Sequence, residues 1–394
     1  MGTIHCQCFK RVAPAALAMT FVLSIPLGGI GQEEGLRAPR YDDHTRLLVV
    51  KDGQGNEVPV ESPADWAVRR AHILAHLQEV MGPLPGGERR VPLAIEILEE
   101  IDEPKFVRKK ITFATEPGDR VPAWLLIPKE ESLEVDDPQD DLPGPETERQ
   151  ADQIKGRRPA ILCPHPTTPI GKDIVVGLGD RPNRDQAREL AERGYVVLAP
   201  DYPNFGEYKL DVYEMGYVSA SMKGIWNHKR GIDLLASLPE VDPDRIGVIG
   251  HSLGGHNSIF VALFDDRVKA VVSSCGFNSF PYYYEGNIAG WSHNGYMPRL
   301  RADYDLDPAR VPFDFPELIA ALAPRPFFTN SPLHDANFEV EGVRVCIETA
   351  QPVYELLGAG DHLKAVYPDA EHDFPPEVRA EAYEFLDRHL GSSR

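Results

Sequence analysis

The chain has few cysteines and few positive charges. Only 5 of its 394 residues are cysteine, and Cys6 and Cys8 fall in a leader-like segment at the start. The other three, Cys163, Cys275 and Cys346, have no metal-like spacing, so we predict no metal site and no disulfide framework, although one disulfide among them stays open. Lys and Arg number 41 against 61 Asp and Glu, a formal net charge of −20. This charge argues against nucleic acid or an anionic membrane surface as a partner, because both would repel the chain.

A long uninterrupted apolar run is also lacking. The one candidate, residues 12–30, follows Lys10 and Arg11 and contains prolines and glycines that disfavour a spanning helix. We interpret residues 1–31 as a signal peptide cleaved near Gly31, which predicts a secreted or periplasmic protein with no stable membrane span after cleavage. A retained membrane anchor is the alternative.

The sequence does contain a glycine-rich turn between a buried strand and a helix. Residues 246–249 are apolar, a Gly-x-Ser-x-Gly motif occupies 250–254, and a helical pattern follows. A serine nucleophile must stand clear of the backbone in a strained turn, so side chains two residues away on either side would clash. We predict Ser252 as the nucleophile. The N–H of Leu253, at the positive end of the next helix, is the first predicted oxyanion donor.

This motif resembles the nucleophile elbow of the α/β-hydrolase superfamily. The resemblance implies a serine hydrolase whose acid and histidine follow the serine in that order. Two looser similarities accompany it. Residues 66–70 with 81–85 resemble the helix that precedes the core in bacterial acetyl-xylan-esterase-like and glucuronoyl-esterase-like hydrolases. The loop at Asp201 is similar to one in dienelactone-hydrolase-like enzymes, where that acid is structural.

Alternating strand and helix patterns run from residue 159 to residue 390 and predict an α/β fold with a doubly wound, mostly parallel sheet, the α/β-hydrolase fold. Before them, three strand-like runs predict an antiparallel opening of the sheet: 91–98, 106–114 and 121–127. Ser62 as N-cap and Pro63 at the first helical position predict a helix that ends at Gly82.

These patterns divide the chain into two parts after the leader. Residues 32–104 are predicted to form an N-terminal arm and a helix that packs on the core, with 32–60 extended. Residues 105–394 are predicted to form the catalytic domain. A stretch rich in acidic residues and proline, 129–158, is predicted to be a solvated loop with no catalytic or binding residues.

The predicted acid and base follow two later strands. Asp335 lies at the carboxyl end of the strand-like run 326–331, on the side where an open α/β sheet places its active site; its rivals are His334, Glu339 and Glu341. His372 follows the last strand, and its Glu-His-Asp-Phe context is similar to the Gly-His-x-Phe loops of the superfamily. We predict Asp335 as the acid and His372 as the general base. His362 and His389 are the alternatives for the base.

The second oxyanion donor is expected in the loop after the strand that ends at Cys163. Pro166 has no N–H, so the donor should be the N–H of Thr167 or Thr168, or a threonine hydroxyl. His165 is predicted to contact the substrate or to be structural rather than to take part in catalysis.

An aromatic segment follows the strand after the nucleophile helix. Residues 277–311 combine several rings with glycine, asparagine and proline, which suits a lid or a substrate wall as well as simple packing. Trp291 and the run 282–284, with Tyr283 at its centre, are the predicted substrate-binding positions.

Together these features predict a secreted serine esterase that hydrolyses small-molecule or polysaccharide esters, acetyl or other small-acyl esters included, without a metal or cofactor. Leu253 stands where glucuronoyl esterases usually carry arginine, which favours a simple carboxylesterase or acetylesterase over them. A prolyl-oligopeptidase-like peptidase is the alternative enzyme, although the chain has no room for a propeller. A non-catalytic binding protein on the same fold is the alternative from another class. The oligomeric state stays open.

Overall fold

The computed structural model describes residues 38–129 and 157–391. The predicted signal peptide, residues 1–31, and all but the ends of the predicted acidic loop 129–158 lie outside the described residues. None of the described helices is long and apolar enough to cross a membrane. Cys163, Cys275 and Cys346 are buried free thiols.

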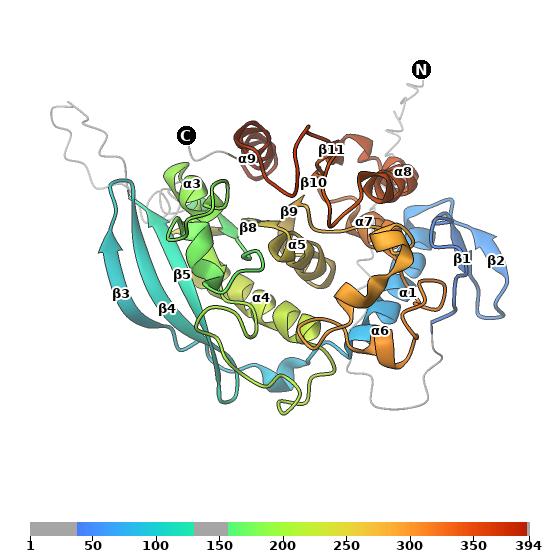
Figure 1. Cartoon of the computed structure of the whole chain (residues 1–394), viewed down its shortest axis with the longest axis horizontal. Helices are drawn as coiled ribbons and strands as arrows, with labels where there is room; N and C mark the ends of the chain where they lie inside the picture. The colour runs from blue at the N-terminus through green and yellow to red at the C-terminus, as the bar shows by residue number, and fades with distance from the viewer. Residues whose placement is uncertain (1–37, 130–156, 392–394) are drawn as a thin grey trace, which may run out of the picture. The chain divides into compact units, whose positions relative to one another are not determined.

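In the described part of the chain, one large sheet of nine strands carries the fold, in the order β11-β10-β9-β8-β6-β7-β5-β4-β3 (Figure 1). Its strands are β3 (Glu96–Asp102), β4 (Phe106–Glu116), β5 (Asp119–Pro128), β6 (Arg158–Leu162), β7 (Val196–Pro200), β8 (Val241–His251), β9 (Val268–Ser274), β10 (Phe327–Asn330) and β11 (Leu363–Val366). The pairs from β3 to β7 are antiparallel and all later pairs are parallel. The predicted mostly parallel α/β sheet is therefore confirmed.

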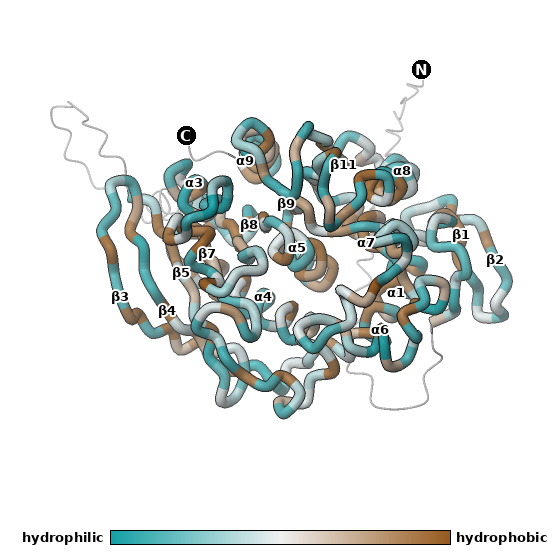
Figure 2. Tube along the Cα trace, viewed as in Figure 1, coloured by the Kyte–Doolittle hydropathy of each residue, from teal (hydrophilic) through white to brown (hydrophobic). Residues whose placement is uncertain are grey.

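Helices cover both faces of this sheet. The longer ones are α1 (Pro63–Met81), α3 (Gln186–Glu192), α4 (Ala220–Ser237), α5 (Leu253–Phe264), α7 (Phe315–Leu322), α8 (Val340–Leu356) and α9 (Pro376–Leu390). Neighbouring strand residues point to opposite faces: Leu162 joins the apolar cluster under α4 and α5, whereas Ile161 joins the cluster under α3 and α9. Figure 2 shows hydrophobic residues gathered on central elements such as α5 and β7. This two-sided cover is what a doubly wound sheet requires.

The N-terminal helix forms as predicted. Ser62 and Asp65 make a reciprocal capping box, and Pro63 opens the helix. Arg69 is fully buried and pairs with the buried Glu317 at the start of α7. Because an unpaired buried charge is strongly destabilising, this ion pair fixes α1 against α7.

Two parts of the N-terminal prediction were wrong. The segment 32–60, expected to be extended, contains a hairpin of β1 (Val49–Lys51) and β2 (Glu57–Pro59), because the Asp52 carboxylate accepts hydrogen bonds from Gln54 and Asn56 and closes a turn. The strand expected at 91–98 forms instead at 96–102, after a left-handed residue at Ala94 (φ 41°). Since β3 pairs with β4, the predicted domain boundary at 104/105 falls between two hydrogen-bonded strands.

Strand β3 is the outer edge of the sheet and is exposed along most of its length. Ile97 and Leu98 are 56% and 57% exposed, and the pairing with β4 shifts register between Ile97 and Glu99. The other side chains of the strand include four carboxylates: Glu96, Glu99, Glu100 and Asp102.

The aromatic segment 277–311 contains only short helices: η3 (Tyr283–Gly286), η4 (Ile288–Trp291) and α6 (Arg299–Ala302). Its start is tied to α7 by Asp314, which accepts hydrogen bonds from Ser279 Oγ (2.6 Å), Phe280 N (2.8 Å) and Phe315 N (2.7 Å). Burial raises the pKa of Asp314 to about 6 in spite of these bonds. The buried carboxyl group of Asp314 thus holds the start of the insertion against α7.

Candidate active site

Ser252 lies in a strained turn between β8 and α5. Its backbone (φ 56°, ψ −119°) is outside the regions that ordinary residues prefer. A Cβ at Gly250 would collide with the backbone of Gly254, and one at Gly254 would collide with the carbonyl of Pro164. The steric reason given for the two glycines is therefore confirmed. The same contacts show that the loop beginning at Pro164 lies against the start of α5.

His372 meets Asp335 across the ends of two strands. Its Nδ1 lies 2.9 Å from each carboxylate oxygen of Asp335, and the Asp335 side chain is 1% exposed against 24% for His372. Backbone N–H groups of Asn337 (2.8 Å) and Phe338 (3.1 Å) also donate to Asp335 Oδ1. A carboxylate held in this way favours the tautomer with the proton on Nδ1 and leaves Nε2 for proton transfer.

The imidazole of His372 lies next to the elbow. Its ring centre is 4.9 Å from that of His251, the residue before Ser252. His251 Nδ1 is 2.9 Å from Ser274 Oγ. Burial first, and then the nearby cations led by Arg184, hold the pKa of His251 well below its usual value. His251 is therefore a neutral neighbour of His372. Its position beside the serine in the motif was a signal that the sequence analysis did not use.

The rival residues have their contacts elsewhere. His334 is exposed and bonds to Asp369 (2.8 Å), and Glu341 pairs with Arg344. His362 bonds to the carbonyl of Pro324 (2.8 Å). Of the residues that the sequence proposed as acid and base, the structure brings Asp335 and His372 into contact.

The two predicted oxyanion donors lie in the first turn of α5 and in the loop after β6. Leu253 is the first residue of α5, so its N–H belongs to the first turn, which lacks intrahelical acceptors. Thr167 is in the loop that begins at Pro164, and its side chain lies near the phenol of Tyr296. Burial raises the pKa of that phenol, and the contact with Thr167 lowers it again in part. That Leu253 and Thr167 stabilise an oxyanion stays a prediction.

His165 does not fit the predicted role of substrate contact. The side chain is 1% exposed, its Nδ1 lies 2.7 Å from the Pro166 carbonyl, and its Nε2 accepts from the Tyr202 N–H at 3.0 Å. Both ring nitrogens are therefore occupied inside the protein, which corrects that assignment. Asp201 is structural, as its resemblance implied: it holds the buried ammonium of Lys172 at 2.9 Å and the backbone N–H of Lys172 at 2.8 Å.

Rings connect the insertion with His372. Phe338 lies 5.9 Å from His372 and from Tyr283 and 6.0 Å from Trp291, measured between ring centres. Trp291 also stacks on His256 at 4.8 Å. Trp291 and Tyr283, the predicted lining residues, thus belong to one aromatic group that reaches His372 through Phe338. His256 could have been found from its place one helical turn after Ser252, whereas Phe338 carried no signal.

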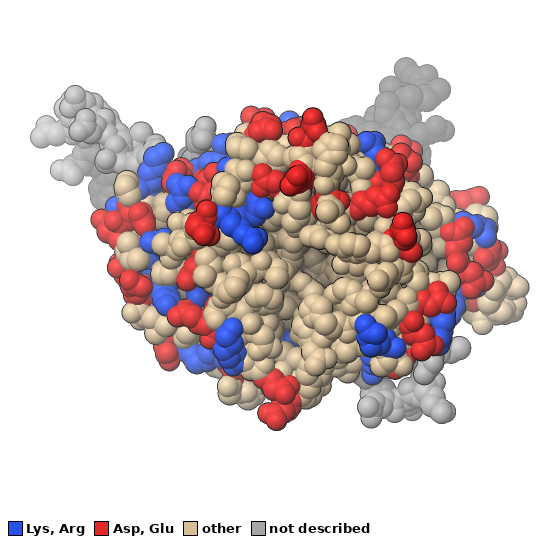
Figure 3. Space-filling model, viewed as in Figure 1, with Lys and Arg blue, Asp and Glu red and all other residues tan. Residues whose placement is uncertain are grey.

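Half of the eight Phe, Tyr and Trp rings of the insertion are nevertheless packed inside. Phe277, Phe280 and Trp291 are at most 4% exposed, whereas Tyr282 and Tyr284 are 37% and 53% exposed. Figure 3 shows that the viewed face is hollowed where Figure 1 places α5, and that the walls of this hollow are mostly uncharged.

One group of metal-ligand types occurs among the described residues. The ligand atoms of Cys275, Asp335 and His372 lie within 4.8 Å of one another. Burial raises the pKa of the Cys275 thiol well above its usual value, and the charge of Asp335 raises it further. A metal would require the thiolate and would compete with the contact between Asp335 and His372. The group is therefore better described as an acid–imidazole pair beside a neutral thiol.

Comparison with known proteins agrees with the fold and the chemistry. A sequence model of the family described as glucuronyl esterase, fungi, matches residues 206–358. The Bacillus subtilis protein YtaP, described as a hydrolase, is 26% identical over 333 residues, which cover 82% of this chain and 100% of YtaP.

Two solved structures share the architecture. A glucuronoyl esterase from Solibacter usitatus superposes with a TM-score of 0.65 at 19% identity and covers 90% of this chain and 99% of its own. A Bacteroides fragilis protein described as an acetyl xylan esterase gives a TM-score of 0.56 at 21% identity, with 78% and 76% covered. The α/β-hydrolase fold that the elbow predicts is confirmed.

Proposed function

We propose that the chain is a secreted serine esterase on the α/β-hydrolase fold that removes small acyl groups, acetyl the simplest, from polysaccharides. The observation that supports this most is the contact of the buried Asp335 with His372 next to the strained turn at Ser252. Asp335 and His372 come together from distant parts of the sequence, and with Ser252 they follow the chain order that a serine hydrolase of this type uses.

In the proposed mechanism, His372 Nε2 takes the proton from Ser252 Oγ as the oxygen attacks the ester carbonyl. Asp335 keeps the imidazole oriented and stabilises its charged form. The oxyanion accepts hydrogen bonds from the Leu253 N–H and from Thr167. His372 then protonates the leaving alcohol, and water repeats the sequence on the acyl-enzyme.

Secretion is proposed from the leader alone. Residues 1–31 combine a basic start with an interrupted apolar run. An exported esterase would meet extracellular polysaccharide, and the exposed rings of Tyr282 and Tyr284 in the insertion have flat faces of the kind that suit sugar rings.

A second candidate substrate is a uronic acid ester, in which the sugar is the acyl part. The match to the glucuronyl esterase family and the superposition on the Solibacter usitatus enzyme favour it. Against it stands Leu253 directly after the nucleophile, where such enzymes usually carry arginine.

Hydrolysis of p-nitrophenyl acetate, butyrate and octanoate by the mature chain and by Ser252→Ala tests the proposal. Activity that fades with acyl length and disappears in Ser252→Ala supports a small-acyl serine esterase. Acetylated xylan and a benzyl ester of glucuronic acid then separate the two candidates. Activity retained by Ser252→Ala, or none on any ester, would refute the proposed mechanism and direct attention to peptides or to ligand binding.

A further inference from the structure

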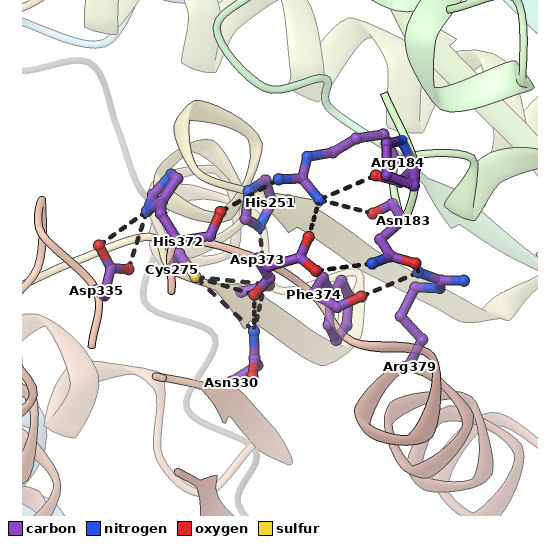
Figure 4. Close-up of polar contacts among 12 residues, drawn as sticks. Asn183, Arg184, His251, Cys275, Asn330, Asp335, His372, Asp373, Phe374 and Arg379 are labelled. Atoms are coloured by element: carbon purple, nitrogen blue, oxygen red, sulfur yellow. Dashed lines mark hydrogen bonds and ion pairs between the residues drawn. The ribbon is translucent and has the colours of Figure 1, made fainter. Parts of the chain in front are cut away.

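The loop that carries His372 is held through its backbone as well as through the imidazole. Three successive carbonyl groups accept hydrogen bonds from side chains: His372 O from Arg184 (3.2 Å), Asp373 O from Asn330 (2.8 Å), and Phe374 O from Arg379 (3.0 Å). These contacts are drawn in Figure 4. Because they come from different elements, they restrain the three successive peptide planes that follow His372.

The carboxylate of Asp373 adds a charged contact. It accepts from Arg184 at 2.5 Å and from Asn183 Nδ2 at 2.7 Å. Burial alone would raise the pKa of Asp373, but the hydrogen bonds from Arg184 and Asn183 outweigh it and hold the pKa below its usual value. Arg184 thus uses one nitrogen for the carboxylate of Asp373 and the other for the carbonyl of His372, a fork that lysine cannot reproduce.

Arg184 is buried, and the residue before it is held by further hydrogen bonds. It is 8% exposed, and its neighbour Asn183 has a left-handed backbone (φ 60°). Asn183 Oδ1 accepts from Arg379 at 2.7 Å, and Arg379 makes a two-bond contact with Glu189 of α3 at 3.0 and 3.1 Å. The strained residue before Arg184 is therefore held by a network that joins α3 to α9.

We propose that Arg184 is a positioning residue for the reaction: with Asp373 as its partner, it fixes the backbone of His372 so that the imidazole keeps its place between Asp335 and Ser252. This inference rests on the proposed function, because it assumes that His372 is the general base. Arg184 acts on the rate through His372 and contacts no reacting atom.

The proposal predicts a particular kinetic signature. Displacement of a catalytic group by about 1 Å can cost about 100-fold in rate, so Arg184→Met should lower kcat by about 10- to 100-fold. KM should stay near its wild-type value, because the arginine does not face the substrate. Arg184→Lys should recover part of kcat, since one ammonium can still meet Asp373.

A double-mutant cycle with His372→Ala isolates the route of this effect. In the His372→Ala background, Arg184→Met should cause no further loss of residual activity. The matched control is Arg193→Met, which removes another ion pair between α3 and α9, with Asp387 at 2.6 Å, and which should leave kcat unchanged.

Hydrogen exchange of residues 368–375 gives a second measure that needs no substrate. Exchange there should accelerate in Arg184→Met but not in Arg193→Met. Unchanged exchange, a higher KM at unchanged kcat, or an equal loss of rate in the His372→Ala background would overturn the role of Arg184. If Ser252→Ala retains activity, the proposed function fails, and the exchange measurement still decides whether Arg184 holds the loop.

Discussion

The two sides of Ser252 are built from different interactions. On the side of His372, directional contacts restrain the side chain and the backbone carbonyls of residues 372–374. On the side of the insertion, ring packing dominates. Among the described residues, Trp291 Nε1 and both ring nitrogens of His256 are buried there without a hydrogen-bond partner.

The two kinds of interaction suit different functions, namely orienting a catalytic group and shaping the substrate site. Hydrogen bonds and ion pairs fix the orientation of a proton-transfer group, because they weaken steeply with angle and distance. Ring packing fixes volume and shape but tolerates small shifts. Changes on the His372 side should therefore alter kcat at nearly constant stability, whereas changes in the insertion should alter stability and substrate choice.

The largest effect is expected for Asp335→Asn. An amide can hold the imidazole only in the wrong tautomer, and kcat should fall by about 10³- to 10⁴-fold with little change in the urea midpoint. The control is Asp369→Asn, which changes an exposed carboxylate that contacts His334 on the same side of the sheet. A mild loss for Asp335→Asn, or an equal loss for Asp369→Asn, would contradict the proposed acid.

Trp291→Ala should give the largest effect on stability within the insertion. Removing a buried tryptophan leaves a cavity and typically costs about 3–5 kcal/mol, whereas kcat on p-nitrophenyl acetate should change little. Urea unfolding and steady-state kinetics on the same samples measure both quantities. Tyr284→Ala, at an exposed ring of the same segment, is the control and should be mild. If Trp291→Ala lowered kcat as much as Asp335→Asn, the insertion would affect the reaction rate and not only stability, contrary to this comparison.

Asp314 offers a test with a defined sign in pH. Its folded pKa of about 6 lies above the usual value near 4, so between these values the folded state holds a proton that the unfolded state has released. Stability contributed by this group is therefore present at about pH 4 and lost as the pH rises through 6, by at most about 3 kcal/mol.

Asp314→Asn should remove that loss, because an amide cannot ionise. Relative to the variant, the wild type should lose stability from pH 4 to pH 7 in urea unfolding. A difference that is constant in pH, or that runs the other way, would show that Asp314 is charged when folded. The start of the insertion would then be held by an ionised carboxylate, as the loop of His372 is.

The smallest effect is expected for His256→Phe. Because both ring nitrogens of His256 are buried without partners, an apolar ring loses no hydrogen bond, and stability should stay within about 1 kcal/mol. Calorimetric melting and KM for the acetate ester measure this. A marked rise in KM would show that His256 bonds the substrate, and the insertion would then contribute directional contacts as well.

The sequence predicted the parts of the site that obey local rules. Gly250, Ser252 and Gly254 could be predicted because steric requirements act within five residues. Asp335 and His372 could be predicted because each comes directly after a strand. The contacts around Arg184 could not be predicted, because it lies 189 positions from Asp373 and no periodic pattern links the two. Likewise, no sequence pattern links Phe338 to Trp291, and the two rings meet only in the folded chain.

Differences between predicted and observed elements also have local causes. The hairpin of β1 and β2 was missed because a single carboxylate, Asp52, organises its turn. The substrate-contact reading of His165 failed and its structural alternative held, because contacts with Pro166 and Tyr202 occupy both of its ring nitrogens in the folded chain.

The exposed edge strand β3 has a consequence for handling the protein in solution. Ile97 and Leu98 lie on an edge that no other described strand pairs with, and a second copy can add its own strand to such an edge. Four carboxylates on the same seven residues oppose this by repulsion between copies, and the shifted register beside Ile97 makes the edge irregular. Salt screens this repulsion, so we expect the colloidal stability of the folded protein to decline at high salt before its fold does.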